Sequence, residues 1–111
     1  MDLALKAIGD PRRREILRLV AFGELSSGQV AARFQDVTGP AISQHLRVLL
    51  DAGLVTVRRD GTRRLYRARP EGFAEVRRFL DEYWRESLAS LREAAEMEER
   101  RKRHGTDPER N

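Results

Sequence analysis

At 111 residues and 12.8 kDa, the chain is long enough for one domain with a modest hydrophobic core. Charged residues make up 36% of it and the net charge is +4, which favours a polyanionic partner, while the complete lack of cysteine excludes disulfides, thiol catalysis and thiolate metal sites. No apolar run approaches the length of a membrane span, and Met1 is not followed by a secretory leader pattern, so we expect a cytosolic protein without membrane contact.

Two helices are predicted in the first part of the chain. A short one covers residues 3–8, and Asp10-Pro11 then caps and starts a second, which Gly23 ends. Its buried side is expected to consist of Ile16, Leu17, Leu19, Val20 and Phe22. Arg12 to Arg14 stand in its first turn, where the helix dipole disfavours cations. They indicate an anionic partner, or salt bridges to Glu15 or to an acid elsewhere in the fold.

The third and fourth helices follow closely. Ser26 or Ser27 caps the third, whose inward-facing residues are Val30, Ala31 and Phe34. Thr38 caps the fourth, Pro40 sits in its first turn and Gly53 stops it. One face of the fourth helix is an apolar stripe of Ile42, Leu46, Leu49 and Leu50. The opposite face carries Ser43, Gln44, Arg47 and Asp51. Serine, glutamine and arginine can read base edges and phosphates; the alternative is an ordinary solvated face.

A basic hairpin follows the fourth helix directly. Residues 54–59 and 63–68 alternate partially, and Asp60-Gly61 between them is a strong hairpin signal. The ribbon carries Arg58, Arg59, Arg63, Arg64 and Arg67. Only Asp60 opposes these cations locally, so they would repel one another unless an anion lies near. The alternative is a hairpin that its charge merely keeps soluble.

The last helix is predicted over about residues 72–97. Its apolar stripe follows three- and four-residue steps through Phe73, Val76, Leu80, Tyr83, Trp84, Leu88, Leu91 and Ala95. So small a domain cannot easily cover all of that stripe, and we expect another chain to cover its distal part; a wholly intramolecular stripe is the alternative. The expected contacts with the second chain are Leu3, Leu5, Leu80, Trp84, Leu88 and Leu91. We therefore predict one domain over residues 1–97, ending in this dimerisation helix, and a charged, disordered tail over residues 98–111.

Taken together, these segments resemble the winged helix-turn-helix of ArsR-type (ArsR/SmtB-like) transcriptional repressors. The matching segments are AIGDPRRREIL (7–17) and ELSSGQVAARF (24–34) in the early helices, PAISQHL (40–46) in the recognition helix, LLDAGLV (49–55), and GTRRLYR (61–67) in the wing. The resemblance covers about residues 3–95. It implies a mainly α fold with a small antiparallel β-hairpin, in the order α-α-α-α-β-β-α, and a two-fold dimer built from the first and last helices.

We therefore predict a sequence-specific DNA-binding regulator, a dimeric repressor that binds an inverted-repeat operator in double-stranded DNA. The recognition-helix residues expected at the DNA are Thr38, Pro40, Ala41, Ser43, Gln44, His45 and Arg47. The expected wing contacts are Arg58, Arg59, Arg63 and Arg64. His45 lies at the flank between the two faces of its helix, so it either packs or donates to a phosphate, and the resemblance favours DNA contact. The alternative is a winged-helix module that binds an acidic protein, against which the polar reading face argues.

The residues argue against metal sensing. Members of the family that sense thiophilic metals carry cysteines near the third helix, where this chain has residues 25–27 (LSS), and others place His and acidic ligands along the last helix, in which no His is expected here. His45 and His104 alone cannot supply the three or four ligands of a divalent site. We expect no metal and no cofactor, with a site shared between subunits as the alternative. No nucleophile with a base and no Gly-rich phosphate loop is present, so we expect no catalytic residues and no enzyme. Whether a small-molecule effector exists stays open.

Overall fold

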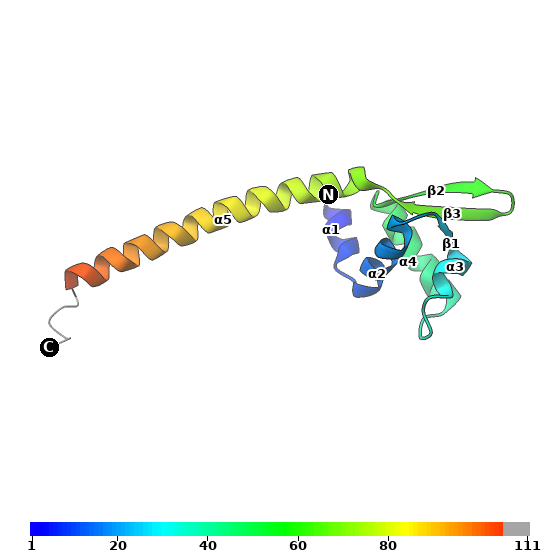
Figure 1. The fold of residues 1–111 in the computed structure, drawn as a ribbon, viewed down its shortest axis with the longest axis horizontal. Coiled ribbons are helices and arrows are strands. Elements are labelled where there is room, and N and C mark those ends of the chain that lie inside the picture. Colours follow the sequence, from blue (N-terminus) through cyan, green and yellow to red (C-terminus); the bar gives the residue numbers. More distant parts are fainter. Residues whose placement is uncertain (106–111) are drawn as a thin grey trace. The chain divides into compact units, whose positions relative to one another are not determined.

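The computed structural model describes residues 1–105, with side chains described up to Arg103. The elements, which Figure 1 labels, are α1 (Asp2–Ile8), α2 (Pro11–Ala21), β1 (Leu25–Ser26), α3 (Ser27–Ala31), α4 (Gly39–Asp51), β2 (Val55–Asp60), β3 (Arg63–Ala68) and α5 (Pro70–Gly105). One compact unit comprises residues 1–77, and a second begins at residue 78, so α5 contributes to both. The predicted class, mainly α with an antiparallel β-hairpin, is confirmed.

Side-chain caps start three of the helices as the sequence predicts. The Asp10 carboxylate accepts from the backbone N–H of Arg12 at 2.8 Å, and the Thr38 hydroxyl accepts from that of Ala41 at 3.2 Å. Of the two serines considered for the third helix, Ser26 is the cap, and it forms a capping box with the side chain of Gln29. These caps satisfy backbone donors that a helix start leaves without an intrahelical partner.

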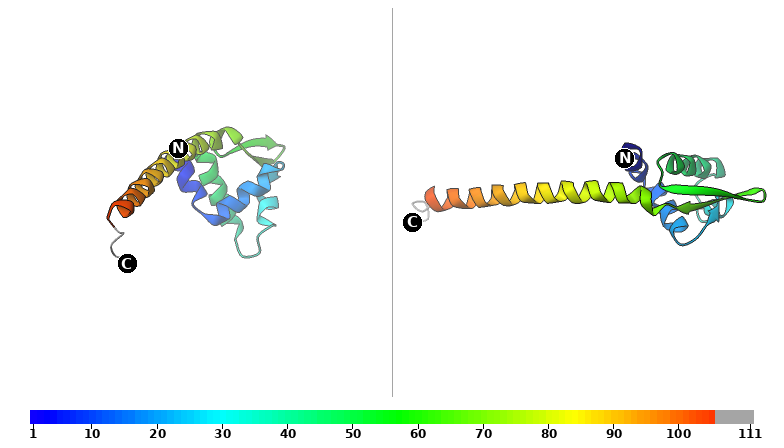
Figure 2. Two further views of the ribbon diagram at one scale, coloured as in Figure 1. Left: turned by 60° about the vertical axis from the view of Figure 1, so that its left-hand side comes forward. Right: turned by 90° about the horizontal axis from the view of Figure 1, so that it is seen from above.

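The antiparallel sheet has one strand more than expected. Its order is β1-β3-β2, with Leu25 opposite Tyr66 and Ser26 opposite Leu65. Figure 2 shows the β2–β3 hairpin, here called the wing, extending past α4. In the wing Asp60 pairs with Arg63, so the turn residues lie one position later than predicted, at positions 61 and 62.

Gly61 has φ +64, whereas no residue other than glycine in the described part of the chain has a positive φ. A positive φ at the first turn residue alone is the pattern of a type II′ turn, which favours glycine there.

The core of the first unit joins α1, α2, α3, α4, the wing and the start of α5. Its buried members are Ala4, Ala7, Ile16, Leu17, Val20, Val30, Ile42, Leu46, Leu49, Leu54, Val55 and Val76. The predicted stripe of α4 is confirmed at Ile42, Leu46 and Leu49, each 0% exposed. The prediction for Phe22 is wrong, because its side chain is 93% exposed. Phe22 follows the last residue of α2, and at about 100° per residue it would also lie about 120° from Ile16.

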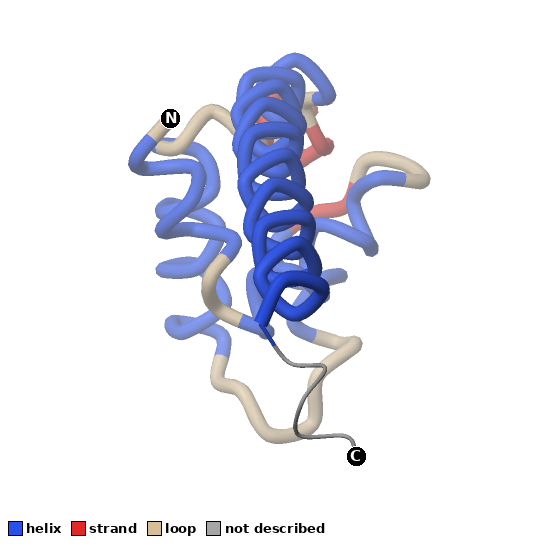
Figure 3. Tube along the Cα trace, turned by 90° about the vertical axis from the view of Figure 1, so that its left-hand side faces the viewer, coloured by secondary structure: helices blue, strands red, loops and turns tan. Residues whose placement is uncertain are grey.

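The last helix is longer than predicted at both ends. It begins at Pro70 and continues to Gly105, so the predicted end at residue 97 is wrong, and the expected tail from residue 98 begins as helix. Figure 3 shows the helical tube of α5 without interruption. Ion pairs between residues three and four apart, Arg101 with Glu98 and Arg103 with Glu99, contribute modestly to the stability of this helical segment without apolar residues. The rest of the predicted tail, residues 106–111, lies outside the described residues. None of the helices described has a stretch both long and apolar enough to cross a lipid bilayer.

Candidate nucleic-acid interface

The polar face of α4 is exposed as predicted. Ser43, Gln44 and Arg47 are exposed, and so are Thr38 and Pro40 at the start of the helix. Ala41, also expected at the DNA, is half-buried. Arg47 lies 3.4 Å from Asp51, one helical turn further on, and both side chains are more than half exposed. Because water screens such an exposed pair, it holds Arg47 only weakly and leaves the guanidinium available to a partner.

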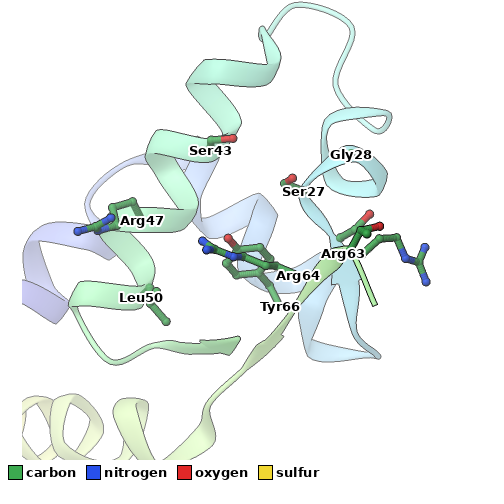
Figure 4. A pocket seen from close by; sticks show the side chains of 10 residues that line it. Ser27, Gly28, Ser43, Arg47, Leu50, Arg63, Arg64 and Tyr66 are labelled. Carbon is green, nitrogen blue, oxygen red and sulfur yellow. The ribbon is translucent and has the colours of Figure 1, made fainter. Parts of the chain in front are cut away.

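A cleft of about 580 Å³ separates α4 and the start of α3 from the wing. It is lined by Ser26, Ser27, Gly28, Ser43, Arg47, Leu50, Thr62, Arg63, Arg64 and Tyr66. Figure 4 shows Arg64 and Tyr66 extending from β3 towards α4, and the hydroxyl of Ser43 pointing into the gap from α4. In the same view Arg63 points away from α4. The recognition helix and the wing therefore present hydroxyl and guanidinium groups to one shared opening.

The two faces of the wing differ in how their arginines are neutralised. Arg59 lies directly opposite Arg64 in the register of the hairpin, and side chains alternate along a strand, so this pair shares one face with Tyr66. Like charges directly opposite each other on neighbouring strands destabilise the sheet. Both arginines are exposed, and neither forms an ion pair with any residue that the structure describes. This face of the wing therefore lacks an anion of its own.

On the other face, carboxylates are present. Arg58 donates two hydrogen bonds to the carboxylate of Glu24, from Nε to Oε2 at 2.5 Å and from Nη2 to Oε1 at 2.9 Å. These bonds lower the pKa of the Glu24 carboxyl and raise that of the Arg58 guanidinium. Arg63 lies 3.8 Å from Asp60 across the turn. Within the hairpin Asp60 is the only carboxylate, as expected, but Glu24 adds a second from outside it. Glu24 was missed because β1, beside which it lies, was not predicted.

The arginines at the start of α2 have partners within the fold. Arg12 forms a two-bond ion pair with Asp36, with Nη1 2.9 Å from Oδ1, and this pair lowers the pKa of Asp36. The Nη1 of Arg14 donates to the carbonyl oxygen of Ile8 at 2.7 Å, and Arg13 reaches the same end of α1. The carboxyl end of a helix carries partial negative charge, so α1 stabilises cations that α2 alone would disfavour. Of the two predicted explanations, the intramolecular one holds.

His45 lies on the flank of α4 that faces α2. Its side chain is half-buried, and its Nδ1 is 3.4 Å from Nη1 of Arg13. The Nε of Arg13 donates at 2.7 Å to the carbonyl oxygen of Ala7, and a carboxylate oxygen of Asp10 lies 3.8 Å from Nη1. Nδ1 of His45 therefore packs against Arg13, and the second ring nitrogen, Nε2, forms no hydrogen bond with the described residues.

The residues expected at a dimer contact are mostly exposed. The exposed fraction is 60% for Leu3, 38% for Leu80, 56% for Trp84, 58% for Leu88 and 64% for Leu91, while Leu5 is half-buried against the core. The expectation that the first part of the stripe packs within its own chain is confirmed by Val76, which is 4% exposed.

Sequence reasoning missed Phe79, whose ring stacks on Tyr83 with centroids 6.2 Å apart. The available signal was its spacing, three residues after Val76 and four before Tyr83.

No group of three or more His, Asp or Glu side chains within the described residues could hold a metal ion. The extended α5 includes His104, although we expected no histidine in this helix; its side chain lies outside the described part.

Comparison with known proteins identifies relatives of the whole arrangement. Residues 8–58 match the family model described as a helix-turn-helix domain. The HTH-type transcriptional regulator Rv2034 of Mycobacterium tuberculosis is 41% identical over 97 residues, which cover 87% of this chain and 90% of that protein. The arsenical resistance operon repressor of Staphylococcus xylosus is 36% identical over 81 residues, covering 73% and 77%. A solved homodimeric winged helix-turn-helix DNA-binding domain from Mycobacterium bovis, described as a possible ArsR-family transcriptional regulator, is 34% identical with a TM-score of 0.60, covering 73% of this chain and 78% of that one.

Proposed function

The chain belongs to the ArsR family of winged helix-turn-helix transcriptional regulators, which bind DNA, and we propose that it is a homodimeric repressor of a specific operator. The observation that carries the proposal is the cleft in which the polar face of α4 meets the Arg59–Arg64 face of the wing. A duplex fits both needs of this surface, because base edges suit the amide and hydroxyl groups and phosphates neutralise the opposed arginines.

In this proposal α4 reads bases from the major groove. Gln44 can bind adenine through two hydrogen bonds, Arg47 can do the same with guanine, and Ser43 can pair with either. Thr38, Pro40 and Ala41 stand at the start of the helix and approach the sugar-phosphate backbone. In this proposal His45 packs against Arg13 through Nδ1 and is not counted among the direct contacts.

The wing supplies charge in this proposal. Arg59 and Arg64 contact the phosphates or the adjacent minor groove, which relieves their mutual repulsion. Arg58 and Arg63 contribute less, because Glu24 and Asp60 already neutralise them.

Separate mutations in helix and wing test this division. The operator duplex is first selected by the wild-type protein from fragments of its own genome, and binding is then measured on that duplex and on a scrambled one over a salt series. Gln44→Ala should lose roughly 1–3 kcal/mol on the operator and far less on the scrambled duplex. Arg64→Ala should weaken binding to both and reduce the slope of log affinity against log salt by about 0.9 for each phosphate that is no longer neutralised.

Arg18→Ala is the matched control for charge, because Arg18 is exposed on α2, away from the cleft lining. It removes the same unit of charge and should leave the salt slope close to that of the wild type. Equal losses on both duplexes for Gln44→Ala would show that α4 does not read sequence, and the proposal of a specific repressor would then fail.

The dimer contact is proposed to be an antiparallel pairing of two α5 helices. The α5 seam, which we define as Leu80, Trp84, Leu88, Leu91 and Ala95, occupies one face of the helix at three- and four-residue steps. An exposed apolar stripe of this kind marks an interaction surface. Four of its residues, Leu80, Trp84, Leu91 and Ala95, are also spaced symmetrically, so an antiparallel two-fold pairing can place apolar side chains of the two copies against each other.

The symmetry has its midpoint between Ser87 and Leu88. Trp84 and Leu91 lie at equal separations on either side of that point, and so do Leu80 and Ala95. An antiparallel pairing centred there places each large side chain against a smaller or flexible one of the partner copy. The charges that border the seam, Arg77 before it and Glu98 after it, also lie at equal separations and have opposite signs. They would therefore attract across the pairing.

Single cysteines can test this register, because the chain has none of its own. Ser87→Cys should form a disulfide with its own copy, since the two positions meet beside the two-fold axis. Ala95→Cys should not, because its copy would lie about 22 Å away along the axis, but it should cross-link to Leu80→Cys in a mixed sample. Self-cross-linking of Ala95→Cys would indicate a parallel pairing instead.

The proposal includes indifference to metals, the absence of catalysis and a cytoplasmic location. Thiophilic ions lack the cysteine ligands that they prefer, and His45 is engaged by Arg13. The name of the Staphylococcus xylosus relative, an arsenical resistance operon repressor, makes the metal question the first one to test.

A further inference from the structure

Arg13 connects three helices of the first unit. It belongs to α2, its Nε donates at 2.7 Å to the carbonyl oxygen of Ala7, and its Nη2 donates at 3.4 Å to that of Lys6, both at the end of α1. Its Nη1 lies 3.4 Å from Nδ1 of His45 on α4. The side chain is only 17% exposed. A single guanidinium therefore holds the recognition helix against the end of α1.

The contact between Arg13 and His45 requires one particular state of the imidazole. A guanidinium has donors only, so Nδ1 must accept, and the ring is then neutral with its proton on Nε2. A protonated imidazole donates from both nitrogens and has no acceptor left. Protonation would therefore abolish this hydrogen bond and place two cations 3.4 Å apart.

One nearby carboxylate, that of Asp10, offsets part of this repulsion. From α2, Asp10 faces the pair, but its carboxylate already accepts from the backbone N–H of Arg12 and of Arg13. Burial alone would raise the pKa of Asp10, yet these backbone donors and the charges of Arg13 and His45 outweigh it and lower that pKa.

The other carboxylates on elements packed against α4 are Asp2 on α1, Glu15 on α2 and Asp60 on β2, and none of them forms an ion pair with Arg13 or His45 within the described residues. From α1, the hydrogen-bond partners of Arg13 are the carbonyl oxygens of Lys6 and Ala7, and the one cation of α1 is Lys6. The residues of α3 carry no ionisable side chain. The charged residues of β2 are residues 58–60, near the turn of the wing. Arg58 pairs with Glu24 and Asp60 with Arg63, while Arg59 lies opposite Arg64.

We propose that Arg13 and His45 are positioning residues that hold α4 in its DNA-binding orientation only while His45 is neutral, so that acidification weakens operator binding. This inference rests on the proposed function, because it concerns how the reading helix is held. A direct contact of His45 with a phosphate would change the affinity in the opposite direction, because a protonated His45 at a phosphate would strengthen binding in acid.

The test measures affinity for the selected operator duplex at constant ionic strength between about pH 8 and pH 5.5. Wild-type affinity should fall by about fivefold or more towards the acid end, the lower bound of common coupling between sites. His45→Asn keeps an acceptor near the position of Nδ1 and does not titrate, so its affinity should match the wild type at the upper pH and stay flat. His104→Asn removes the other histidine and should keep the full pH dependence.

A second variant separates the role of Arg13. Arg13→Gln replaces the cation by a neutral amide, so protonation of His45 should no longer be opposed and the pH dependence should flatten, even where the affinity itself is lower. Circular dichroism at both ends of the range establishes that each variant is folded.

An affinity that rises on acidification, and does so only with His45 present, would overturn the inference and make His45 a phosphate contact. A pH dependence that survives in His45→Asn would overturn it as well. Failure of every variant and of the wild type to prefer the operator over scrambled DNA would instead overturn the proposed function, and the inference with it.

Discussion

A methyl group added at Gly72 should destabilise the fold strongly, because α5 begins in contact with the turn that follows α4. A Cβ built there lies 2.1 Å from the carbonyl oxygen of Gly53, 2.9 Å from its carbonyl carbon and 3.3 Å from Cα of Leu54. Optimal separations between non-bonded heavy atoms are about 3.5–4.0 Å, so the backbone must move by more than about 1 Å at the closest point. The obstacle is backbone, which no side-chain rotation can relieve.

The turn that Gly72 meets is held in place. Gly53 has φ +74, its N–H donates to the carbonyl of Leu50 at 3.0 Å, and its own carbonyl accepts from Nη1 of Arg69 at 3.1 Å. Overpacking a well-packed site costs about 1–3 kcal/mol, and the reduced entropy of the unfolded chain returns about 0.4–1 kcal/mol when glycine becomes alanine. The upper part of the first range applies here, so we expect Gly72→Ala to lose about 2 kcal/mol of unfolding free energy. That corresponds to a fall in Tm on the order of 10 °C for a domain of this size.

Gly28→Ala is the matched control for the same substitution. Gly28 also lies in the first turn of a helix, and a Cβ there meets only the Ser26 hydroxyl oxygen, at an ordinary 3.9 Å. This variant should be as stable as the wild type or more stable by up to about 1 kcal/mol. Urea unfolding of all three proteins, at one protein concentration because dimerisation adds to stability, provides the comparison. Equal midpoints for the two variants would show that α5 does not approach the turn as closely as described.

Three further outcomes are expected. Leu88→Glu places a charge beside the midpoint of the α5 seam, so it should give a monomer in sedimentation and weaken operator binding; a stable dimer would exclude the seam as the contact. Titration of zinc, cadmium, nickel or arsenite into a protein–operator complex, with and without chelator, should release no DNA, and release at stoichiometric metal would reveal a missed site. The folded-state pKa of Glu24 is lowered below its ordinary 4.5, chiefly by the hydrogen bonds from Arg58, so the pair stabilises the fold above that value and this contribution is lost as the pH falls through the lowered pKa. The difference in Tm between wild type and Glu24→Gln should therefore shrink in acid, and a difference that is constant with pH would contradict the pair.

The local signals in the sequence predicted most of the helices and their buried faces. The sequence predicted the helix caps at Asp10 and Thr38. It also predicted the buried stripe of α4, because caps and stripes depend on residues within a few positions of one another. The two-residue strand β1 carries no periodicity of its own and exists only because β3 lies beside it, so single-sequence reasoning had no signal for it.

Charge pairs were the hardest part of the candidate interface to predict. Glu24 and Arg58 are 34 positions apart in the sequence. Their contact can be predicted only once the positions of β1 and the wing are known. The prediction for the distal end of α5 was wrong for a different reason. The absence of apolar residues was interpreted as disorder, although Glu98 with Arg101 and Glu99 with Arg103 have the spacing of helical ion pairs.

The distribution of charge over the wing has a consequence for how the protein could combine specificity with affinity. A wing with all its arginines neutralised internally would contribute little attraction to DNA, and one with none neutralised would add a strong attraction to any duplex. Here two arginines of one face, Arg58 and Arg63, are paired with Glu24 and Asp60, while the face that shares the cleft with α4 carries the opposed pair Arg59 and Arg64. Attraction is therefore concentrated where the polar residues of α4 can meet base edges.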